Sequence, residues 1–362
     1  ISALKHRLWD ALKDMEEGLE KRPENELLWL EKGRIHLINS ETDEPIQRTY
    51  HYQTAYYSFE EARRLGIDST QSAEIDNLLQ RYWAQEHNAG IHALESGEYD
   101  DRLRDAASHL RNAVALKPNE ISSYIALTNA YYSADKIKLA VKTLRDAEEN
   151  LDTPNAQIYE KLGFLSLEQG KIEDAITFYQ LSIDISDNKN AAFGLVNAYI
   201  SNGESLKAVD LLTGLLTRYP NETDINHVYG VQLNIVLDGY LTQLHQAYKD
   251  DNSVEVEQLR EAIENMMEGA EGQLTQAYKN DISNTSFVES LAIFYNNLTS
   301  KYLEMLEVAY TEHVDIMSDS AADYLDKAIT YYKRMEQLRP NEKEYAKKAE
   351  NLGELRIVLF TY

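Results

Sequence analysis

The residue types that most often do chemistry in enzymes are present in this sequence, but not at the spacings that catalysis uses. His87 and His92 are close in sequence, yet five residues along a helix do not place two imidazoles on one face. Gly163 and the Gly170-Lys171 pair lack the spacing of a phosphate-binding loop, and no Ser or Thr follows the lysine. Carboxylate pairs such as Glu16-Glu17 recur along the whole chain, so they single out no acid–base site. We therefore expect no catalytic residues, no metal site and no cofactor.

The charge balance restricts the partners. The 362 residues carry 36 Lys and Arg against 61 Asp and Glu, a formal net charge of −25. This charge repels nucleic acid and anionic lipid surfaces at long range, so nucleic acid is not an expected partner. Two interpretations remain: a solvated exterior that keeps the protein in solution, or an acidic groove for a basic peptide.

Cysteine and hydropathy bear on the compartment. There is no cysteine, which excludes disulfides and thiolate chemistry. No apolar run approaches the ~20 residues that a membrane-spanning helix needs. The sequence begins at Ile1 without Met, as removal of a leading segment would leave. We expect a cell-envelope or periplasmic location in a bacterium slightly more than a cytoplasmic one.

The elements that must position any site are amphipathic helices that repeat along the chain. Within residues 155–188, small and apolar residues recur at three-and-four spacing, which predicts two antiparallel helices joined by a turn at 168–171. Ala140 to Ala175 is 35 residues and Ala175 to Ala208 is 33, so the pattern returns at a nearly fixed period. A single pair cannot bury its apolar face alone, and neighbours are required.

The pattern resembles the tetratricopeptide repeat family, whose first helix carries an aromatic residue and Leu-Gly, and whose second carries Ala, an aromatic residue and a later Pro. The matching residues are Tyr159, Leu162, Gly163, Ala175 and Tyr179, with Asp187 where the proline would be. The resemblance implies an all-α fold, a right-handed solenoid of helix pairs. It also implies a non-catalytic scaffold that binds another protein or peptide in a concave groove lined by the first helices.

We expect one solenoid over residues 1–362. Its parts in order are a half repeat (1–23), two repeats with insertions (24–118), three regular repeats (119–222), elongated helix pairs (223–340) and a C-terminal capping helix (341–362). The insertions, at 39–47 and around 97–101, are expected in loops. The elongated helices are predicted over 224–249, 254–279, 286–313 and 318–338. In the half repeat, Trp9 and Leu12 are expected to pack on the helix that carries Trp29.

The resemblance places the binding site on the exposed faces of the first helices in the regular repeats. The matching positions are Asn129, Tyr132, Glu160, Phe164, Leu167, Phe193 and Asn197. Large apolar side chains that face solvent usually mark a partner surface, unless a tight superhelix buries Phe164 and Phe193 against its opposite wall. Asn129 and Asn197 carry amides that can bond both the N–H and the C=O of a bound peptide.

Two other hypotheses stay open. The elongated helices from 224 to 338 could form a small-molecule pocket, for a glycan for example, in an accessory or substrate-binding component of a larger assembly. Alternatively, the chain could be a spacer.

Overall fold

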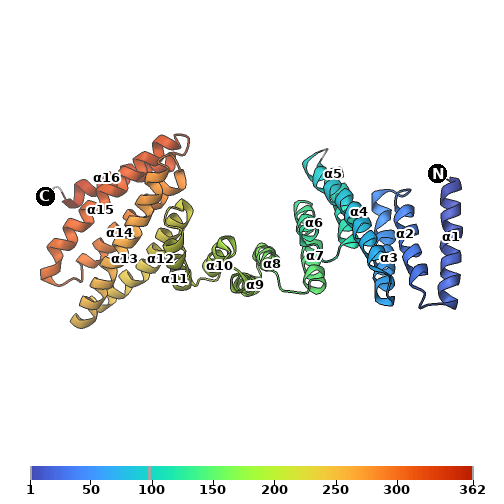
Figure 1. The fold of residues 1–362 in the computed structure, drawn as a ribbon. Coiled ribbons are helices and arrows are strands. Elements are labelled where there is room, and N and C mark those ends of the chain that lie inside the picture. Colours follow the sequence, from blue (N-terminus) through green and yellow to red (C-terminus); the bar gives the residue numbers. More distant parts are fainter. Residues whose placement is uncertain (1, 97–98, 361–362) are drawn as a thin grey trace. The chain divides into compact units, whose positions relative to one another are not determined.

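The structure, a computed structural model, describes residues 2–96 and 99–360. Within these ranges the regular secondary structure is α-helix throughout, in sixteen helices, as the sequence predicted (Figure 1). The chain separates into two compact units, residues 1–188 (unit 1) and residues 189–362 (unit 2). None of the helices in the described ranges combines the length and the apolar character that crossing a membrane requires.

Unit 1 consists of one helix followed by four helix pairs. Its described helices are α1 (Ser2–Lys21), α2 (Glu26–Ser40), α3 (Pro45–Leu65), α4 (Ser69–Glu95), α5 (Tyr99–Leu116), α6 (Ile121–Ser133), α7 (Ile137–Asn150), α8 (Ala156–Glu168) and α9 (Ile172–Ile185). The members of each pair, α2–α3, α4–α5, α6–α7 and α8–α9, pack directly on one another. The predicted repeats of this part of the chain are therefore helix pairs.

Three of these pairs cross where a glycine of the first helix meets a large side chain of the second. A Cβ atom on Gly33 would lie 2.4 Å from the Phe59 ring, and one on Gly163 would lie 2.8 Å from the Tyr179 ring. Both distances are too short for carbon–carbon contact, so only glycine permits this approach. The second helices of six pairs each carry an alanine that is 0% exposed: Ala55, Ala106, Ala140, Ala175, Ala208 and Ala328.

Local signals fix the ends of the short helices. The Asn155 side chain accepts hydrogen bonds from the backbone N–H groups of Gln157 and Ile158, which begins α8. Gly170, in the turn between α8 and α9, has a φ of 70° that favours glycine. In the turn between α6 and α7 the left-handed residue is instead Asp135, with a φ of 55°.

The insertion expected at 39–47 is a loop only in its middle. Helix α2 continues to Ser40 and α3 begins at Pro45, so residues 41–44 alone connect them. Proline suits the first helical position because its φ is preset and its missing N–H has no helical partner there. The extra residues therefore lengthen α3. Of the second insertion, residues 97 and 98 lie outside the described ranges.

The prediction for Trp9 was wrong, because its side chain is 61% exposed. Helix α1 contacts α2 through its C-terminal half instead, where Gly18 lies against Leu28 and Leu19 is buried. Leu12 is half-buried.

A buried polar cluster joins α3 and α5 to α4. The Glu86 carboxylate, 3% exposed, accepts hydrogen bonds from the Arg48 guanidinium (3.0 Å), the Tyr52 hydroxyl (2.8 Å) and the Asn112 amide (3.2 Å). His109 Nδ1 lies 2.6 Å from the same carboxylate. Burial acts to raise the pKa of Glu86, but the hydrogen bonds outweigh it and hold that pKa below its usual value. The carboxylate is therefore charged, and one residue fixes the positions of three helices.

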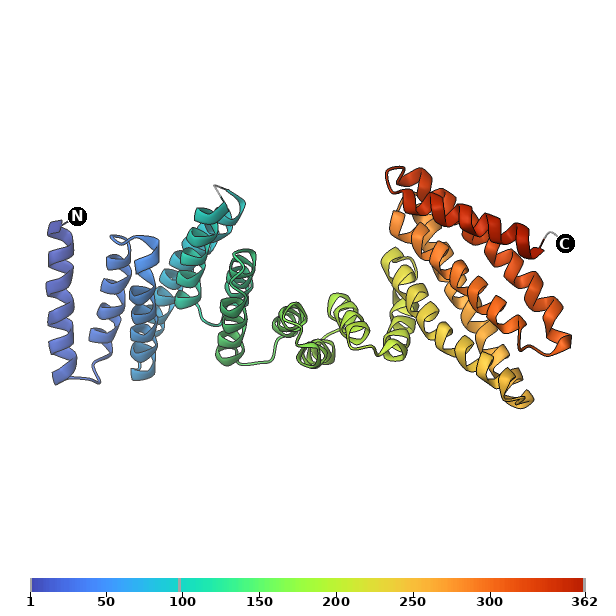
Figure 2. The same ribbon diagram turned by 180° about the vertical axis from the view of Figure 1, so that it is seen from behind.

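Unit 2 begins with a short pair and continues with much longer helices. Those described are α10 (Lys189–Ser201), α11 (Ser205–Arg218), α12 (Thr223–Lys249), α13 (Ser253–Asn280), α14 (Thr285–Leu306), α15 (Thr311–Leu338) and α16 (Lys343–Phe360). The expected elongated pairs are α12–α13 and α14–α15, and α16 packs on α15 (Figure 2).

One boundary in unit 2 corrects the sequence prediction. Helix α14 ends at Leu306 rather than at residue 313, and α15 starts at Thr311 rather than at 318. The reversal at 307–310 contains neither Gly nor Pro, and its residues Val308, Ala309 and Tyr310 pack on the apolar core of unit 2. Because this turn is as apolar as the helices beside it, the spacing of apolar residues did not reveal where α14 ends.

Candidate functional site

The predicted site residues of unit 1 lie on α6 and α8, the first helices of two successive pairs. Asn129 and Tyr132 are three residues apart on α6, and both are exposed. On α8, Glu160, Phe164 and Leu167 follow at intervals of four and three, so they share one helix face. We call these five residues the α6–α8 surface.

Two aromatic rings join the two helices of this surface. The Tyr132 and Phe164 ring centroids are 5.2 Å apart with an interplanar angle of 71°, the edge-to-face arrangement that aromatic pairs prefer. Each side chain remains 37% exposed. The Tyr132 hydroxyl donates to Glu168 Oε2 at 3.4 Å, and burial together with Glu168 raises the pKa of Tyr132, which keeps the phenol neutral. The pair forms an ordered apolar contact area across two repeats.

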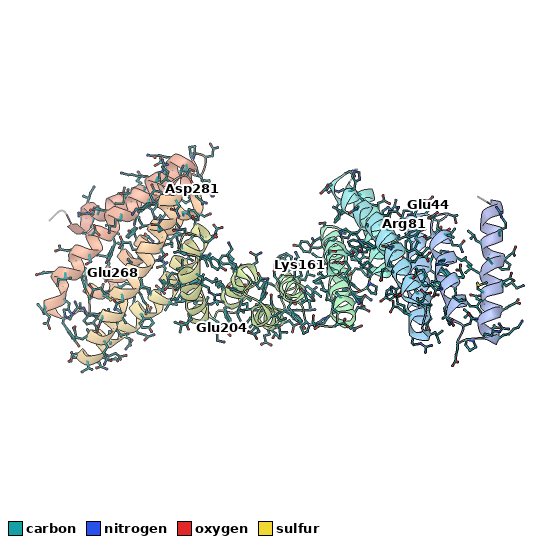
Figure 3. The ribbon with its side chains drawn as sticks, viewed as in Figure 1. Glu44, Arg81, Lys161, Glu204, Glu268 and Asp281 are labelled. Carbon is teal, nitrogen blue, oxygen red and sulfur yellow. The ribbon has the colours of Figure 1, made fainter. Side chains whose placement is uncertain are left out.

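The rest of α8 explains why Phe164 faces outward. Ile158, Leu162 and Leu165 are each 1% exposed and form the inward face of the helix. Phe164 lies between two of them in sequence, so helical periodicity turns its side chain away from the core. On the same outer face, Glu160 Oε2 accepts a 2.7 Å hydrogen bond from the Asn188 amide. The next residue, Lys161, is labelled in Figure 3.

The remaining predicted residues, Phe193 and Asn197, belong to unit 2. They lie four residues apart on α10, where Asn197 is exposed and Phe193 is half-buried. Phe193 is therefore less accessible than the sequence suggested. That these two residues extend the α6–α8 surface stays a prediction.

A second feature is a cleft of about 540 Å³ among the long helices of unit 2. The sequence left a small-molecule pocket open in this region, but it did not indicate which residues would line one. Its lining includes Glu257, Arg260, Glu261, Glu264, Met267, Tyr302, Ser320 and Tyr324. The Tyr302 and Tyr324 rings meet edge to face at 5.3 Å, and their hydroxyls lie 3.5 and 3.8 Å from Met267 Sδ. Burial raises the pKa of both tyrosines, so both stay neutral. The sequence feature that could have indicated this cleft is the seven-residue spacing of tyrosines along α14 and along α15.

Within residues 2–96 and 99–360, no three His, Asp or Glu side chains lie close enough together to hold one metal ion.

Comparisons with known proteins place the chain among helical-repeat proteins. No family model matches the sequence. The TPR repeat-containing protein MJ1428 of Methanocaldococcus jannaschii is 27% identical over 123 residues, 33% of this chain. The match covers only 21% of that relative's length.

Solved structures give weaker similarity. PilF of Pseudomonas aeruginosa aligns with a TM-score of 0.47 at 15% identity, over 75% of this chain and 99% of that one. YrrB, described as a TPR protein with an unusual peptide-binding site, aligns with a TM-score of 0.38 at 16% identity, over 56% and 97%.

Three findings agree on the type of repeat. The repeat period is 33 to 35 residues, the helix pairs cross at glycine and alanine, and part of the sequence is similar to MJ1428. The chain is built of tetratricopeptide-like helix pairs.

Proposed function

We propose that this chain is a non-catalytic scaffold that binds a segment of another protein, extended or helical, on the α6–α8 surface. Proteins built of such repeats generally present extended surfaces to protein partners. The single observation that carries the proposal is the exposed edge-to-face pair of Tyr132 and Phe164. The proposal extends to Phe193 and Asn197, which occupy the equivalent helix of the next repeat.

The chemistry of the surface suits a protein segment. Aromatic side chains are enriched among the few residues that dominate binding energy at interfaces. Because Tyr132 and Phe164 already hold one another, little side-chain entropy remains to be lost when a partner covers them. The Asn129 amide, one helical turn away, can both donate to and accept from the partner's backbone.

The net charge favours a basic partner. A chain with a formal charge of −25 attracts positively charged segments at long range and speeds their association. We expect the association rate to fall as salt is added, because the Debye length shortens from roughly 30 Å at 0.01 M to about 8 Å at 0.15 M.

The test is a change at Phe164 compared with a matched change outside the surface. Phe164→Ala should weaken a captured partner by at least ~1 kcal/mol, about fivefold in Kd, while leaving helicity unchanged. Leu181, on α9 of the same pair, is 39% exposed and provides the control, Leu181→Ala. A partner that tolerates Phe164→Ala but is lost with Leu181→Ala would place the site on the second helices and overturn the proposal.

A second candidate function, ligand binding by a component of a larger assembly, is favoured by the cleft in unit 2. A cleft of about 540 Å³ lies in the size range of small-molecule pockets. A ligand bound there should raise the melting temperature of the chain, and above Kd the increase should follow the logarithm of the ligand concentration. Phe164→Ala should leave that increase unchanged, since the α6–α8 surface belongs to unit 1.

A further inference from the structure

Unit 2 already holds one of its own ammonium groups on an aromatic ring. Lys327 Nζ, on α15, lies 5.1 Å from the centroid of the Tyr295 ring, 3.1 Å from Glu271 Oε1 and 3.0 Å from Asp323 Oδ2. Tyr295 in turn stacks on Tyr331 at 5.7 Å. Burial acts to lower the pKa of Lys327, but the two carboxylates outweigh it and raise that pKa, so the group stays charged. We call this group of residues the Lys327 site.

The same residue types recur seven positions away on all three helices. Glu264 corresponds to Glu271 on α13, Tyr302 to Tyr295 on α14, and Tyr324 to Tyr331 on α15. Tyr295 contacts Tyr331, and Tyr302 contacts Tyr324, so α14 runs antiparallel to α15. Seven residues forward along α14 and seven residues back along α15 therefore lead in the same direction. Seven residues correspond to about 10.5 Å along a helix. The second set repeats the glutamate and the two tyrosines two turns away, but its rings meet edge to face where those of the first set are stacked.

Two members of the copy differ. Seven residues before Lys327, α15 carries Ser320, and seven residues before Asp323 it carries Ile316, neither of which has a charge. Ser320, Glu264, Tyr302 and Tyr324 all line the cleft of about 540 Å³. The cleft therefore presents the tyrosines and one of the two carboxylates of the Lys327 site, without its lysine.

The carboxylates of the cleft are available to a ligand. The Tyr295 hydroxyl donates to Glu271 at 2.6 Å, whereas the hydroxyls of Tyr302 and Tyr324 interact with one another and with the Met267 sulfur, and neither donates to Glu264. Glu261 and Glu264 are exposed, and neither forms an ion pair within residues 2–96 and 99–360.

The one basic residue that lines the cleft, Arg260, already has two partners. Arg260 Nη1 lies 3.1 Å from Glu257 Oε1 and 2.8 Å from His313 Nε2. The charged groups that line the cleft are three glutamates and this one arginine, so the lining keeps a net negative charge.

We propose that this cleft binds a primary alkylammonium group, supplied either by a lysine side chain of a partner protein or by a free polyamine. The ammonium would lie against the rings of Tyr302 and Tyr324 and beside Glu264, as Lys327 lies on Tyr295 beside Glu271. Attraction between a cation and a ring face adds to the charge pairing when water is partly excluded. The site needs no residue of the α6–α8 surface, so it stands independently of the scaffold proposal.

The first test measures amine binding to the full chain by calorimetry at low salt. Two probes are used, spermidine and N-acetyl-lysine N-methylamide, with the neutral N-acetyl-norleucine N-methylamide for comparison. Saturable binding of either amine, weakened at least about fivefold by Glu264→Gln, supports the site. Tighter binding of spermidine indicates a free polyamine, and tighter binding of the lysine derivative indicates a partner side chain.

The matched control separates the cleft from the general acidity of the chain. Glu268, on the same helix but outside the cleft lining, is labelled in Figure 3. Glu268→Gln should change amine binding less than about twofold. Equal losses with Glu264→Gln and Glu268→Gln, or equal binding of the norleucine derivative, would overturn the proposal.

The second test supplies the amine from the chain itself. Ser320→Lys should place an ammonium at the position that corresponds to Lys327, raise the melting temperature above that of Ser320→Met, and abolish binding of both amine probes. Ser320→Met matches the length of the new side chain without its charge. If Ser320→Lys leaves amine binding intact while circular dichroism shows the native helix content, the ammonium does not bind where we place it.

Discussion

The pairs α8–α9 and α14–α15 are built on the same plan but differ in length. The helices of the first are 13 and 14 residues long, and those of the second are 22 and 28. In the short pair the inward positions lie close to the crossing of Gly163 and Tyr179, where little space remains. In the long pair the helices continue well beyond a single repeat, and tyrosine, methionine and charged side chains fill the added interior.

The difference teaches how length changes the kind of site a repeat can offer. A short pair is filled by small residues and Tyr179, so a further aromatic ring such as Phe164 lies on the outside. In the long pairs, side chains of α13, α14 and α15 line a cleft that includes the rings of Tyr302 and Tyr324. The two regions therefore differ in shape, with an exposed aromatic surface on the short pair and a cleft among the long helices.

The largest loss of stability is expected when a buried aromatic ring is removed from the core of the long pair. Phe294 is 0% exposed, so Phe294→Ala should lower the free energy of unfolding of α12–α15 by about 3–5 kcal/mol, measured by amide hydrogen exchange. In the short pair the comparable ring, Phe178, is half-buried on Tyr159, and Phe178→Ala should cost less than half as much. If Phe294→Ala and Phe178→Ala lowered the free energy of unfolding equally, the short and the long pair would depend on buried aromatic rings to the same extent, which would contradict the comparison.

Smaller changes in the free energy of unfolding are expected when two glycines are replaced by alanine, and the two changes should have opposite signs. Gly163→Ala would bring a Cβ to 2.8 Å from the Tyr179 ring and should destabilise the chain by about 1–3 kcal/mol. Gly272, in the long helix α13, has no atom within 4 Å of such a Cβ, so Gly272→Ala should stabilise by up to about 1 kcal/mol through helix propensity. Urea denaturation of both variants measures the two signs. If Gly163→Ala also stabilised the chain, the close crossing of α8 and α9 would be wrong.

The smallest effect concerns the turns. Gly170→Ala forces a left-handed backbone on a residue with a Cβ and should cost about 1–2 kcal/mol. Asp135, at the same place in the preceding pair, already bears that cost, so Asp135→Gly should gain less than about 1 kcal/mol because glycine loses more backbone entropy on folding. Thermal denaturation compares the two variants. The reversal of α14 into α15, residues 307–310, has no residue with positive φ and gives no glycine to test.

Much of the fold could be predicted because its signal repeats. Ala140, Ala175 and Ala208 recur at a nearly constant interval, and each recurrence fixes the register of two helices. The end of α14 could not be found the same way, since Val308, Ala309 and Tyr310 form a turn with helical hydropathy. The exposure of Trp9 was also missed, because periodicity gives the face of a residue but not how far the neighbouring helix extends.

The two sites differ in the same respect. Phe164 could be placed from the sequence because Leu162 and Leu165 occupy the inward positions on either side of it. The cleft of unit 2 required the registers of α13, α14 and α15 relative to one another. No spacing within a single helix contains that information, although Tyr295 and Tyr302 already lie seven residues apart.

The buried Glu86 carries a consequence for how this protein can change in evolution. Its carboxylate serves Arg48, Tyr52, His109 and Asn112 at once, so losing any one partner leaves the others around a poorly neutralised buried charge. Substitutions at these positions should therefore occur together, with Glu86 and its basic partners replaced by apolar side chains at the same time. Descendants of this sequence should retain the whole set or lose the whole set, whereas exposed positions such as Leu181 vary one at a time.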